Sequence, residues 1–227
     1  MAFRRKAEMI LKYNPDILIV PECESNERLN FSMFSNSPNN ILWFGKNQNK
    51  GLGIFSYSDY EIKLQEWYNP NFKTIVPLAV KNKLEEFILF AIWAYNPEDE
   101  KYKYIGQVWK AINYYKEYLD FEKVFLIGDF NSNTIWDKPR RVGNHSSVVQ
   151  FLEERNIYSL YHQYYKEKQG QENQPTLFMY RHKDKSYHID YCFASKYFMN
   201  KIKCMTIGQH CDWNKMSDHM PIIAEFF

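Results

Sequence analysis

Runs of consecutive apolar residues mark the buried strands that this chain is expected to form. Residues 17–20 (ILIV) and 124–127 (VFLI) are two such runs, and residues 220–224 (MPIIA) form a third near the end of the chain. Acidic or amide side chains stand directly beside each run, in the sequences PECE, GDFN and SDH. Charged groups at the mouths of buried strands are costly unless a metal or a ligand uses them. The pattern therefore predicts a hydrolytic metal site assembled from distant parts of one sheet system.

The rest of the pattern predicts helices interspersed with many strands. Helices are expected from Phe3 to Asn14, over 98–119, and from Asn144 as N-cap to about residue 155. The expected strands are 16–20, 41–44, 52–57, 72–80, 86–95, 123–128, 176–180, 187–194, 203–208 and 220–226. Several of these strands are joined as hairpins. We therefore predict an α/β (α+β) protein with mixed sheets covered by helices.

Length and composition change this picture little. A chain of 227 residues most simply forms one domain over 1–227, with two small domains as the alternative. Its 45% apolar and 25% charged residues are ordinary for a globular protein. The net charge of +2 does not by itself indicate a nucleic-acid partner. No apolar stretch approaches the roughly 20 residues that span a bilayer, so we expect no membrane span.

Cysteine usage favours a reducing compartment. The four cysteines, Cys23, Cys192, Cys204 and Cys211, form no CxxC pair. No signal peptide is evident either. We therefore expect a cytoplasmic protein, and the sequence does not indicate its oligomeric state.

Five short motifs resemble those of one known family. They are PE at 21–22, AYNP at 94–97, GDFN at 128–131, HIDY at 188–191 and SDH at 217–219. Their order and approximate spacing are similar to those of the endonuclease/exonuclease/phosphatase superfamily, which includes deoxyribonuclease I, abasic-site endonucleases, sphingomyelinases and inositol-polyphosphate 5-phosphatases. The resemblance runs from about residue 16 to the C-terminus. It implies a four-layer α/β/β/α sandwich of two mixed β-sheets flanked by helices.

Glu22 is the candidate metal ligand. A carboxylate has the hardness that Mg²⁺ prefers, and Mg²⁺ takes one or two carboxylates together with water and substrate phosphate oxygens. The resemblance implies that Glu22 is the principal ligand of Mg²⁺ or Mn²⁺, with Asp218 a further metal or water ligand. A surface carboxylate at a strand end is the alternative for Glu22. Glu24, two residues on, is expected beside the ligand or in solvent.

Asp129 and Asn131 lie two residues apart, so both side chains can point to one side where the strand emerges. A Gly-Asp pair alone is equally typical of a plain turn. Within the family resemblance, Asp129 would orient or deprotonate the attacking water. Asn131 would donate a hydrogen bond to the phosphate, because a carboxylate at that position would repel an anionic substrate.

His219 follows Asp218, and a carboxylate beside an imidazole fixes its tautomer and favours its protonated form. A protonated His219 could stabilise the charge that builds on a pentacovalent phosphorane. The resemblance implies that Asp190 is the orienting carboxylate and that Tyr95 contributes its hydroxyl to a phosphate oxygen. Core packing is the alternative for Tyr95.

Substrate contacts are expected on the segment after the Asp129 strand. Arg140, Arg141 and the helix start near residue 144 make a phosphate-holding surface, and Trp136 could stack on a base. A solvated basic turn is the alternative. The tip at 181–185 could reach a nucleic-acid backbone or remain in water, and His188 is expected to line the pocket.

The motifs indicate metal-assisted phosphoester hydrolysis without a covalent nucleophile. A nuclease acting on DNA or RNA is the first hypothesis. A phosphatase or phosphodiesterase for a small molecule or lipid head group is the second, since family members with such substrates share the catalytic set. A catalytically weakened binding protein is the third.

One family element is not found in this sequence. Members of the family begin with a strand that ends in an Asn-containing run before the first helix, whereas this chain enters its first helix by about Phe3. Two explanations stay open: a genuine variant, or a start codon placed too late. The second is favoured, because the loss of a strand leaves backbone groups of its neighbour unpaired.

Overall fold

The computed structural model describes residues 2–95 and 102–227, so the second half of the AYNP motif and the start of the helix expected at 98–119 lie outside the described residues. The chain forms two compact units, Met1–Trp93 and Ala94–Phe227. Each unit has strands of its own. The prediction of a single domain over 1–227 stays a prediction.

The first unit contains two three-stranded sets of antiparallel strands. In one set the order is β1-β3-β2, and in the other β5 lies between β4 and β6. Both hairpins that the sequence predicts, β2–β3 and β5–β6, are present. The bounds are α1 (Ala7–Leu11), β1 (Ile17–Cys23), β2 (Asn40–Asn47), β3 (Lys50–Ser56), β4 (Glu61–Leu64), β5 (Ile75–Lys81) and β6 (Glu86–Trp93).

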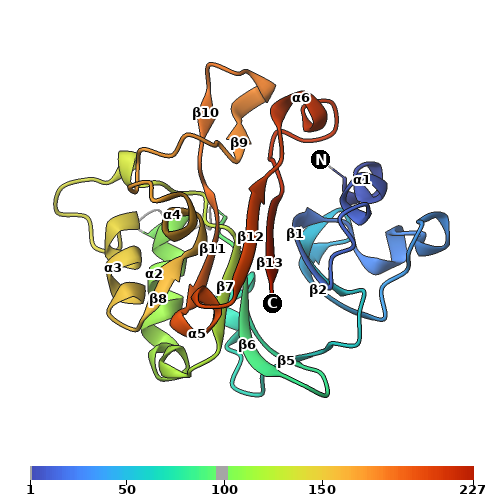
Figure 1. Ribbon diagram of the computed structural model, residues 1–227, viewed down its shortest axis with the longest axis horizontal. Coiled ribbons are helices and arrows are strands. Elements are labelled where there is room, and N and C mark those ends of the chain that lie inside the picture. Colours follow the sequence, from blue (N-terminus) through green and yellow to red (C-terminus); the bar gives the residue numbers. More distant parts are fainter. Residues whose placement is uncertain (1, 96–101) are drawn as a thin grey trace. The chain divides into compact units, whose positions relative to one another are not determined.

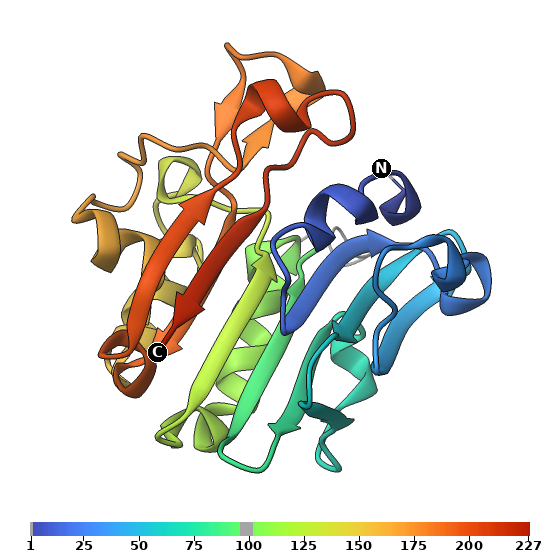
Figure 2. The same ribbon diagram turned by 45° about the vertical axis from the view of Figure 1, so that its right-hand side comes forward.

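The N-terminal segment packs on the face of β1 and β3. Phe3, fully buried, stacks on Phe55 with ring centroids 5.3 Å apart, and Ala7, Val20 and Cys23 complete the same cluster. Figure 2 shows α1 beside β1. Burying two stacked phenyl rings gives several kcal/mol of hydrophobic stabilisation, about 1.5–3 kcal/mol for each side chain.

The second unit is built on the strand order β7-β11-β8, in which neighbouring strands run antiparallel. Two further antiparallel pairs, β9–β10 and β12–β13, belong to it. The bounds are α2 (Ile105–Tyr114), β7 (Val124–Asp129), α3 (His145–Glu153), β8 (Ile157–Ser159), α4 (Leu160–Tyr165), β9 (Leu177–Phe178), β10 (Ser186–Tyr187), β11 (Asp190–Ser195), α5 (Lys196–Met199), β12 (Ile202–Ile207), α6 (His210–Trp213) and β13 (Ile222–Phe226).

Helices and strands of the second unit form layers. Figure 1 shows α2 and α3 on one side of the strands β7, β11 and β8, with β12 and β13 on the other side. Apolar residues of α2 at helical spacing, Ile105, Val108 and Ile112, are buried. The predicted α/β class, with sheets flanked by helices, is therefore confirmed.

Several predicted elements differ in detail from the observed ones. The first helix is split into a 3₁₀ turn (Phe3–Arg5) and α1, and the strand expected at 176–180 is reduced to β9. The strands β4 and β8 and the helices α4, α5 and α6 are absent from the predicted set. All five have six residues or fewer, too few for a periodic pattern to stand out. No helix among the described residues is long and apolar enough to cross a membrane.

Candidate active site

Two aspartates face each other at the ends of neighbouring strands. In the register of β7 and β11, Asp129 pairs directly with Asp190. Asp129 is buried and the Asp190 side chain is 15% exposed. Like charges directly opposite each other on a sheet are destabilising. The pair therefore needs positive charge close by, from a protonated side chain or a cation.

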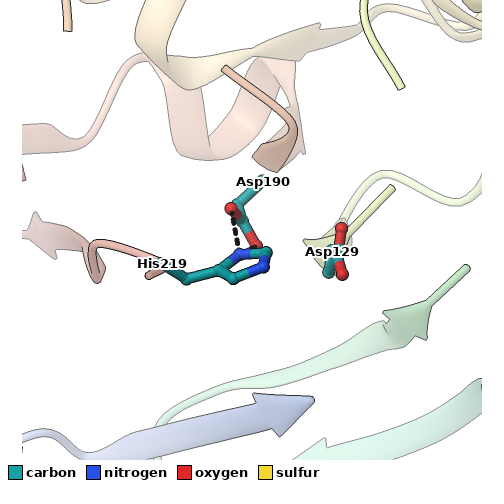
Figure 3. A group of neighbouring side chains, drawn as sticks. All are labelled: Asp129, Asp190 and His219. Atoms are coloured by element: carbon teal, nitrogen blue, oxygen red, sulfur yellow. Dashed lines mark hydrogen bonds and ion pairs between the residues drawn. The ribbon is translucent and has the colours of Figure 1, made fainter. Parts of the chain in front are cut away.

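His219 supplies one such charge. Its Nδ1–H donates to Asp190 Oδ2 at 2.9 Å and lies 3.2 Å from Oδ1, as Figure 3 shows. Burial lowers the pKa of this imidazole, but the charge of Asp190, its hydrogen bond and the charges of Asp129 and Asp218 outweigh burial and raise the pKa to about 9. His219 is therefore a cation at neutral pH.

Backbone pairing fixes the position of His219. Residue 219 forms an isolated antiparallel bridge with Leu177 of β9, and the N–H of Phe178 donates to the carbonyl of Asp218 at 2.8 Å. Thr176, which is fully buried, also holds the backbone of Asp190, because its Oγ1 accepts from the N–H of Asp190 at 3.0 Å. The imidazole and its carboxylate are thus held by the same short segment.

Asn131 is bound to Asp129. Its backbone N–H donates to Asp129 Oδ1 at 2.8 Å, and its side-chain Nδ2 donates to Asp129 Oδ2 at 2.6 Å and to the carbonyl of Ala94 at 2.8 Å. Both amide hydrogens are therefore engaged in this arrangement. Asn131 has φ +47°, an uncommon value for a non-glycine residue that places it in the left-handed region.

Three ligand-type groups converge at this point. One oxygen of Asp129, one of Asp190 and one ring nitrogen of His219 all lie within 4.8 Å of one another. Figure 3 shows the second ring nitrogen of His219 on the side that faces Asp129. The two carboxylates suit a divalent cation, and an added positive charge would relieve the repulsion between them, whereas the protonated ring of His219 has no lone pair to offer a metal. The residues present fit such an ion.

Several solved structures have folds similar to that of this chain over nearly its whole length. A variant of the 3' phosphatase NExo from Neisseria, bound to a product DNA hairpin, gives a TM-score of 0.74 at 19% identity and covers 99% of this chain and 94% of that chain. An AP endonuclease from Archaeoglobus fulgidus gives a TM-score of 0.73 at 18% identity, over 99% and 95%. An endonuclease/exonuclease/phosphatase protein from Beutenbergia cavernae gives 0.61 at 14% identity, over 97% and 65%.

The chain has the fold of the endonuclease/exonuclease/phosphatase superfamily. No family model matches the sequence, and no curated protein matches it either. The predicted family resemblance is thus confirmed at the level of the fold.

Glu22 of the first unit sits on a β-bulge. The register of β1 and β3 shifts between Pro21 and Cys23, and Glu22 has φ +60°. A bulge re-aims a side chain away from the regular alternation of the strand. The Glu22 side chain is 42% exposed, and its Oε1 lies 2.6 Å from Lys50 Nζ.

Glu24 is buried, which contradicts the expectation that it lies in solvent, while its expected place beside a metal ligand stays a prediction. It is 2% exposed, accepts from the N–H of Phe3 at 2.6 Å and forms an ion pair with Arg4. The reason is the N-terminal segment, in which the N–H of Phe3 and the side chain of Arg4 both bind the carboxylate. Glu24 fastens that segment to β1.

Asp218 and Tyr95 are both half-buried. Asp218 adds negative charge beside His219, but its carboxylate does not belong to the convergent group among the described residues. Tyr95 directly follows Ala94, whose N–H donates to the carbonyl of Asp129 at 2.8 Å. Ala94, the first residue of the AYNP motif, is therefore joined to the Asp129 strand end within the second unit.

The expected substrate segment carries an exposed aromatic ring. Trp136 is 40% exposed, and its ring centroid lies 4.9 Å from that of Tyr187. Arg140 is exposed, whereas Arg141 is half-buried and donates to the carbonyl of Lys103 at 3.1 Å. Arg141 thus holds the segment before α2, whereas Arg140 is open to solvent.

The start of α3 is capped by a residue that the sequence pattern did not single out. Asn144 occupies the predicted N-cap position, but the first N–H groups of the helix, those of His145 and Ser146, donate to Asp137 at 2.8 and 3.1 Å. These two groups are therefore engaged by a carboxylate. Phosphate binding at this helix start, which the sequence suggested, would have to displace Asp137.

His188 points into the interior of the second unit. It is 3% exposed, and its ring packs against Tyr161 and Tyr191 with centroids 4.4 and 5.0 Å away. Its Nδ1–H donates to the carbonyl of Gln174 at 2.8 Å. Burial lowers its pKa. The ring thus lies among buried side chains, and its role in substrate binding stays a prediction.

Proposed function

We propose that this chain is a divalent-metal-dependent phosphodiester hydrolase that acts on nucleic acid. The observation that supports it best is the convergence of Asp129, Asp190 and a cationic His219 within 4.8 Å. An imidazolium held by a buried carboxylate stabilises negative charge on a phosphoryl group. The similarity of the fold to those of a 3' phosphatase and an AP endonuclease supports the same activity by analogy.

Each of these side chains has a defined role in the proposed reaction. Asp190 accepts from the Nδ1–H of His219 and stabilises the imidazolium, so that the Nε2–H of the same ring can donate to a phosphoryl oxygen. Asp129 accepts a proton from the attacking water or orients it in line with the leaving oxygen. Asn131 holds the Asp129 carboxylate, since its N–H groups bind both oxygens. Tyr95 would contact another phosphate oxygen.

Mg²⁺ or Mn²⁺ is the proposed metal, with Glu22 and Asp218 as its candidate ligands. When bound, the ion would neutralise the phosphate and stabilise the leaving oxygen. Carboxylate oxygens suit either ion.

Nucleic acid is the proposed substrate because the second unit presents an exposed ring and exposed cations on short segments. Trp136 offers a face on which a base can stack, and Arg140 offers charge for a phosphate. NExo, a 3' phosphatase with a similar fold, was solved with a product DNA hairpin. A cytoplasmic setting is part of the proposal, since all four cysteines are free.

A substrate panel tests the proposal. Supercoiled plasmid, single-stranded DNA, RNA, an abasic duplex, a 3'-phosphorylated oligonucleotide and bis-p-nitrophenyl phosphate are each incubated with Mg²⁺, Mn²⁺ or EDTA. We expect metal-dependent cleavage of at least one nucleic acid, abolished by EDTA and by Asp129→Asn. Cleavage of the chromogenic ester alone would favour the small-molecule or lipid hypothesis. Tight nucleic-acid binding without any cleavage would favour the weakened binding protein.

A further inference from the structure

A buried asparagine joins the two strand ends that carry Asp129 and Asp190. Asn133 is 1% exposed and lies four residues after the last residue of β7. Its Nδ2 donates to the carbonyl of His188 at 2.9 Å and lies 3.2 Å from the hydroxyl of Tyr191. His188 and Tyr191 stand on either side of Asp190 in the sequence. A single amide thus ties the segment after β7 to the beginning of β11.

A buried carboxylate holds this amide in place. Glu172 Oε2 accepts from Asn133 Nδ2 at 3.1 Å, while Oε1 accepts from the N–H of Gly170 at 2.8 Å and from His162 Nε2 at 3.0 Å. The Glu172 side chain is 5% exposed. Burial raises its pKa, but the hydrogen bonds from His162, Gly170 and Asn133 outweigh burial and bring the pKa down to about 2. Glu172 is therefore an anion at working pH.

His162 anchors Glu172 to the sheet. Its Nδ1 lies 2.7 Å from Ser159 Oγ, and Ser159 pairs with Phe193 in the register of β8 and β11. The carboxylate is thus fixed from the side of β8 and α4, both shown in Figure 1. Because each Glu172 oxygen already has its partners and the side chain is buried, Glu172 is not placed to touch a substrate.

The loop that carries Glu172 also packs against the turn before Trp136. Gly170 has φ +81°, and a Cβ there would lie 2.6 Å from Thr134 Oγ1. Asn133 Oδ1 accepts from the N–H of Ile135 at 3.1 Å, which fixes the first turn of the same segment. Only glycine allows this close approach without strain.

The same loop ends at Thr176, which binds the Asp190 segment by a second route. Thr176 Oγ1 accepts from the N–H groups of Ile189 and Asp190 at 2.9 and 3.0 Å, and its carbonyl accepts from the N–H of Met220 at 2.7 Å. Residues 166–176, which we call the support loop, therefore contact the segment that follows β7, the beginning of β11 and the residue after His219.

A second metal site is not the explanation for this cluster. Among residues 2–95 and 102–227, the group of ligand atoms that converge within 4.8 Å is the one formed by Asp129, Asp190 and His219, and it does not include Glu172 or His162. The partners of Glu172 are instead hydrogen-bond donors of the protein itself. A fully satisfied buried polar network of this kind rigidifies what it joins.

We propose that Glu172 is a positioning residue, which acts through Asn133 to hold the ends of β7 and β11 so that Asp129 stays opposite Asp190. The effect on catalysis rests on the proposed function, whereas the effect on the two strand ends does not. A misplacement of catalytic groups by about 1 Å can cost as much as a hundredfold in rate.

Glu172→Gln is the variant that tests this role most selectively. Its remaining carbonyl oxygen can still accept from His162 and Gly170, but its new NH₂ group would face the NH₂ group of Asn133, donor against donor. Glu167→Gln is the matched control on the same loop. Glu167 accepts from the hydroxyl of Tyr161 at 2.7 Å and from the N–H of Asn173, partners that differ from the Asn133, His162 and Gly170 partners of Glu172.

We expect Glu172→Gln to lower kcat about tenfold or more on the substrate that the wild type cleaves fastest, with KM and Mg²⁺ affinity unchanged. The reason is the loss of one buried hydrogen bond, the one between Glu172 and Asn133. Glu167→Gln should stay within about twofold of wild type at equal fractional folding. The double variant with Asn133→Ala should be no slower than Asn133→Ala alone, because both changes break one connection.

Amide hydrogen exchange gives a reading that does not depend on activity. Exchange in segments 129–136 and 188–191 should be faster in Glu172→Gln than in wild type, and unchanged in Glu167→Gln. If wild type hydrolyses no phosphoester, the proposed function fails and exchange alone decides the positioning role. Should Glu172→Gln not fold, Asn133→Ser is measured against the same control. Equal exchange in the two glutamate variants, or rate losses that multiply in the double variant, would overturn the proposal.

Discussion

Two acidic places in this molecule carry similar sequence signals but are built differently. In the second unit, the ion pair of Asp190 and His219 is largely enclosed, with side chains 15% and 33% exposed. In the first unit, the ion pair of Glu22 and Lys50 is open, with side chains 42% and 50% exposed. Backbone pairing holds the Asp190–His219 pair in place, whereas Glu22 of the other pair lies on a bulge at a strand end.

The difference in exposure suggests that the two ion pairs have different roles in the reaction. An exposed ion pair is worth only about 0–1 kcal/mol, so a cation can take the place of Lys50 beside Glu22 at little cost. An enclosed pair keeps its geometry and its charge, which suits a group that must stabilise a transition state. We therefore expect the second unit to set the rate and Glu22 to set the metal requirement.

The largest effect is expected at the enclosed pair and at Asp129, which stands opposite Asp190. His219→Ala and Asp129→Asn should each lower kcat by about a hundredfold or more at equal fractional folding, because each removes a charge or proton acceptor at the reacting group. Steady-state kinetics and thermal melting check this. His182→Ala, an exposed histidine of the same unit, is the control. A rate close to wild type for either variant would remove that residue from the mechanism.

A second effect concerns stability and pH, and it belongs to the second unit alone, since all six histidines of the sequence follow residue 144. His145 is fully buried, and burial lowers its pKa to about 4 against about 6.5 when unfolded. Its neutral form therefore stabilises the fold above about pH 6.5, and this stability is lost as pH falls toward 4, by on the order of a few kcal/mol.

Chemical denaturation at a series of pH values measures this loss, and His145→Phe should flatten it. His219 has the opposite sign: its raised pKa contributes stability below about pH 6.5 that disappears as pH rises through about 9. A stability that is flat from pH 7 to 4.5 in wild type would contradict the assignment of His145 as a buried neutral ring.

A smaller effect is expected at the open pair. Glu22→Gln should raise the Mg²⁺ concentration for half-maximal rate by about tenfold, and saturating Mg²⁺ should restore most of the rate, because one ligand is weakened while the water-orienting group is intact. Metal titrations of the rate check this, with Glu27→Gln on the same unit as control. A rate loss that saturating Mg²⁺ does not repair would show that Glu22 is not a simple ligand.

The smallest effect is expected on the substrate segment. Arg140→Ala should weaken nucleic-acid binding a few-fold and reduce the salt dependence by about one phosphate contact, while hydrolysis of bis-p-nitrophenyl phosphate is spared. Arg141→Ala, which also loses the contact with the carbonyl of Lys103, is the comparison. Equal losses on both substrates would indicate that the arginine supports the fold rather than the substrate.

The strand-end motifs could be predicted because they join two local signals, an apolar run and polar residues directly before or after it. Asp129 and His219 were found in this way, and the family resemblance supplied Asp190. The burial of Glu24 could not be predicted, since it depends on the return of the N-terminal segment, which residue spacing does not encode.

The role of the support loop is what the sequence pattern predicted least. Glu172, Gly170 and Asn133 look like polar loop residues in the sequence, and the sequence predicted only a loop there. Their partners lie 2 to 58 positions away, so their burial follows from the packing of α4 and β11 and not from any local period. Asp137 was missed as a helix cap for the same reason, because it stands eight positions before the N–H that it binds.

The protonation of His219 is the central element of the proposed chemistry, and NMR titration of its imidazole in the metal-free protein measures it directly. With the resonance assigned through His219→Ala, the wild-type ring should titrate with a pKa of about 9. In Asp190→Asn, which removes the facing charge, the pKa should fall toward the usual value of about 6.5. A wild-type pKa at or below about 6.5 would contradict a cationic His219 at neutral pH, and with it the role assigned to the Asp190–His219 pair.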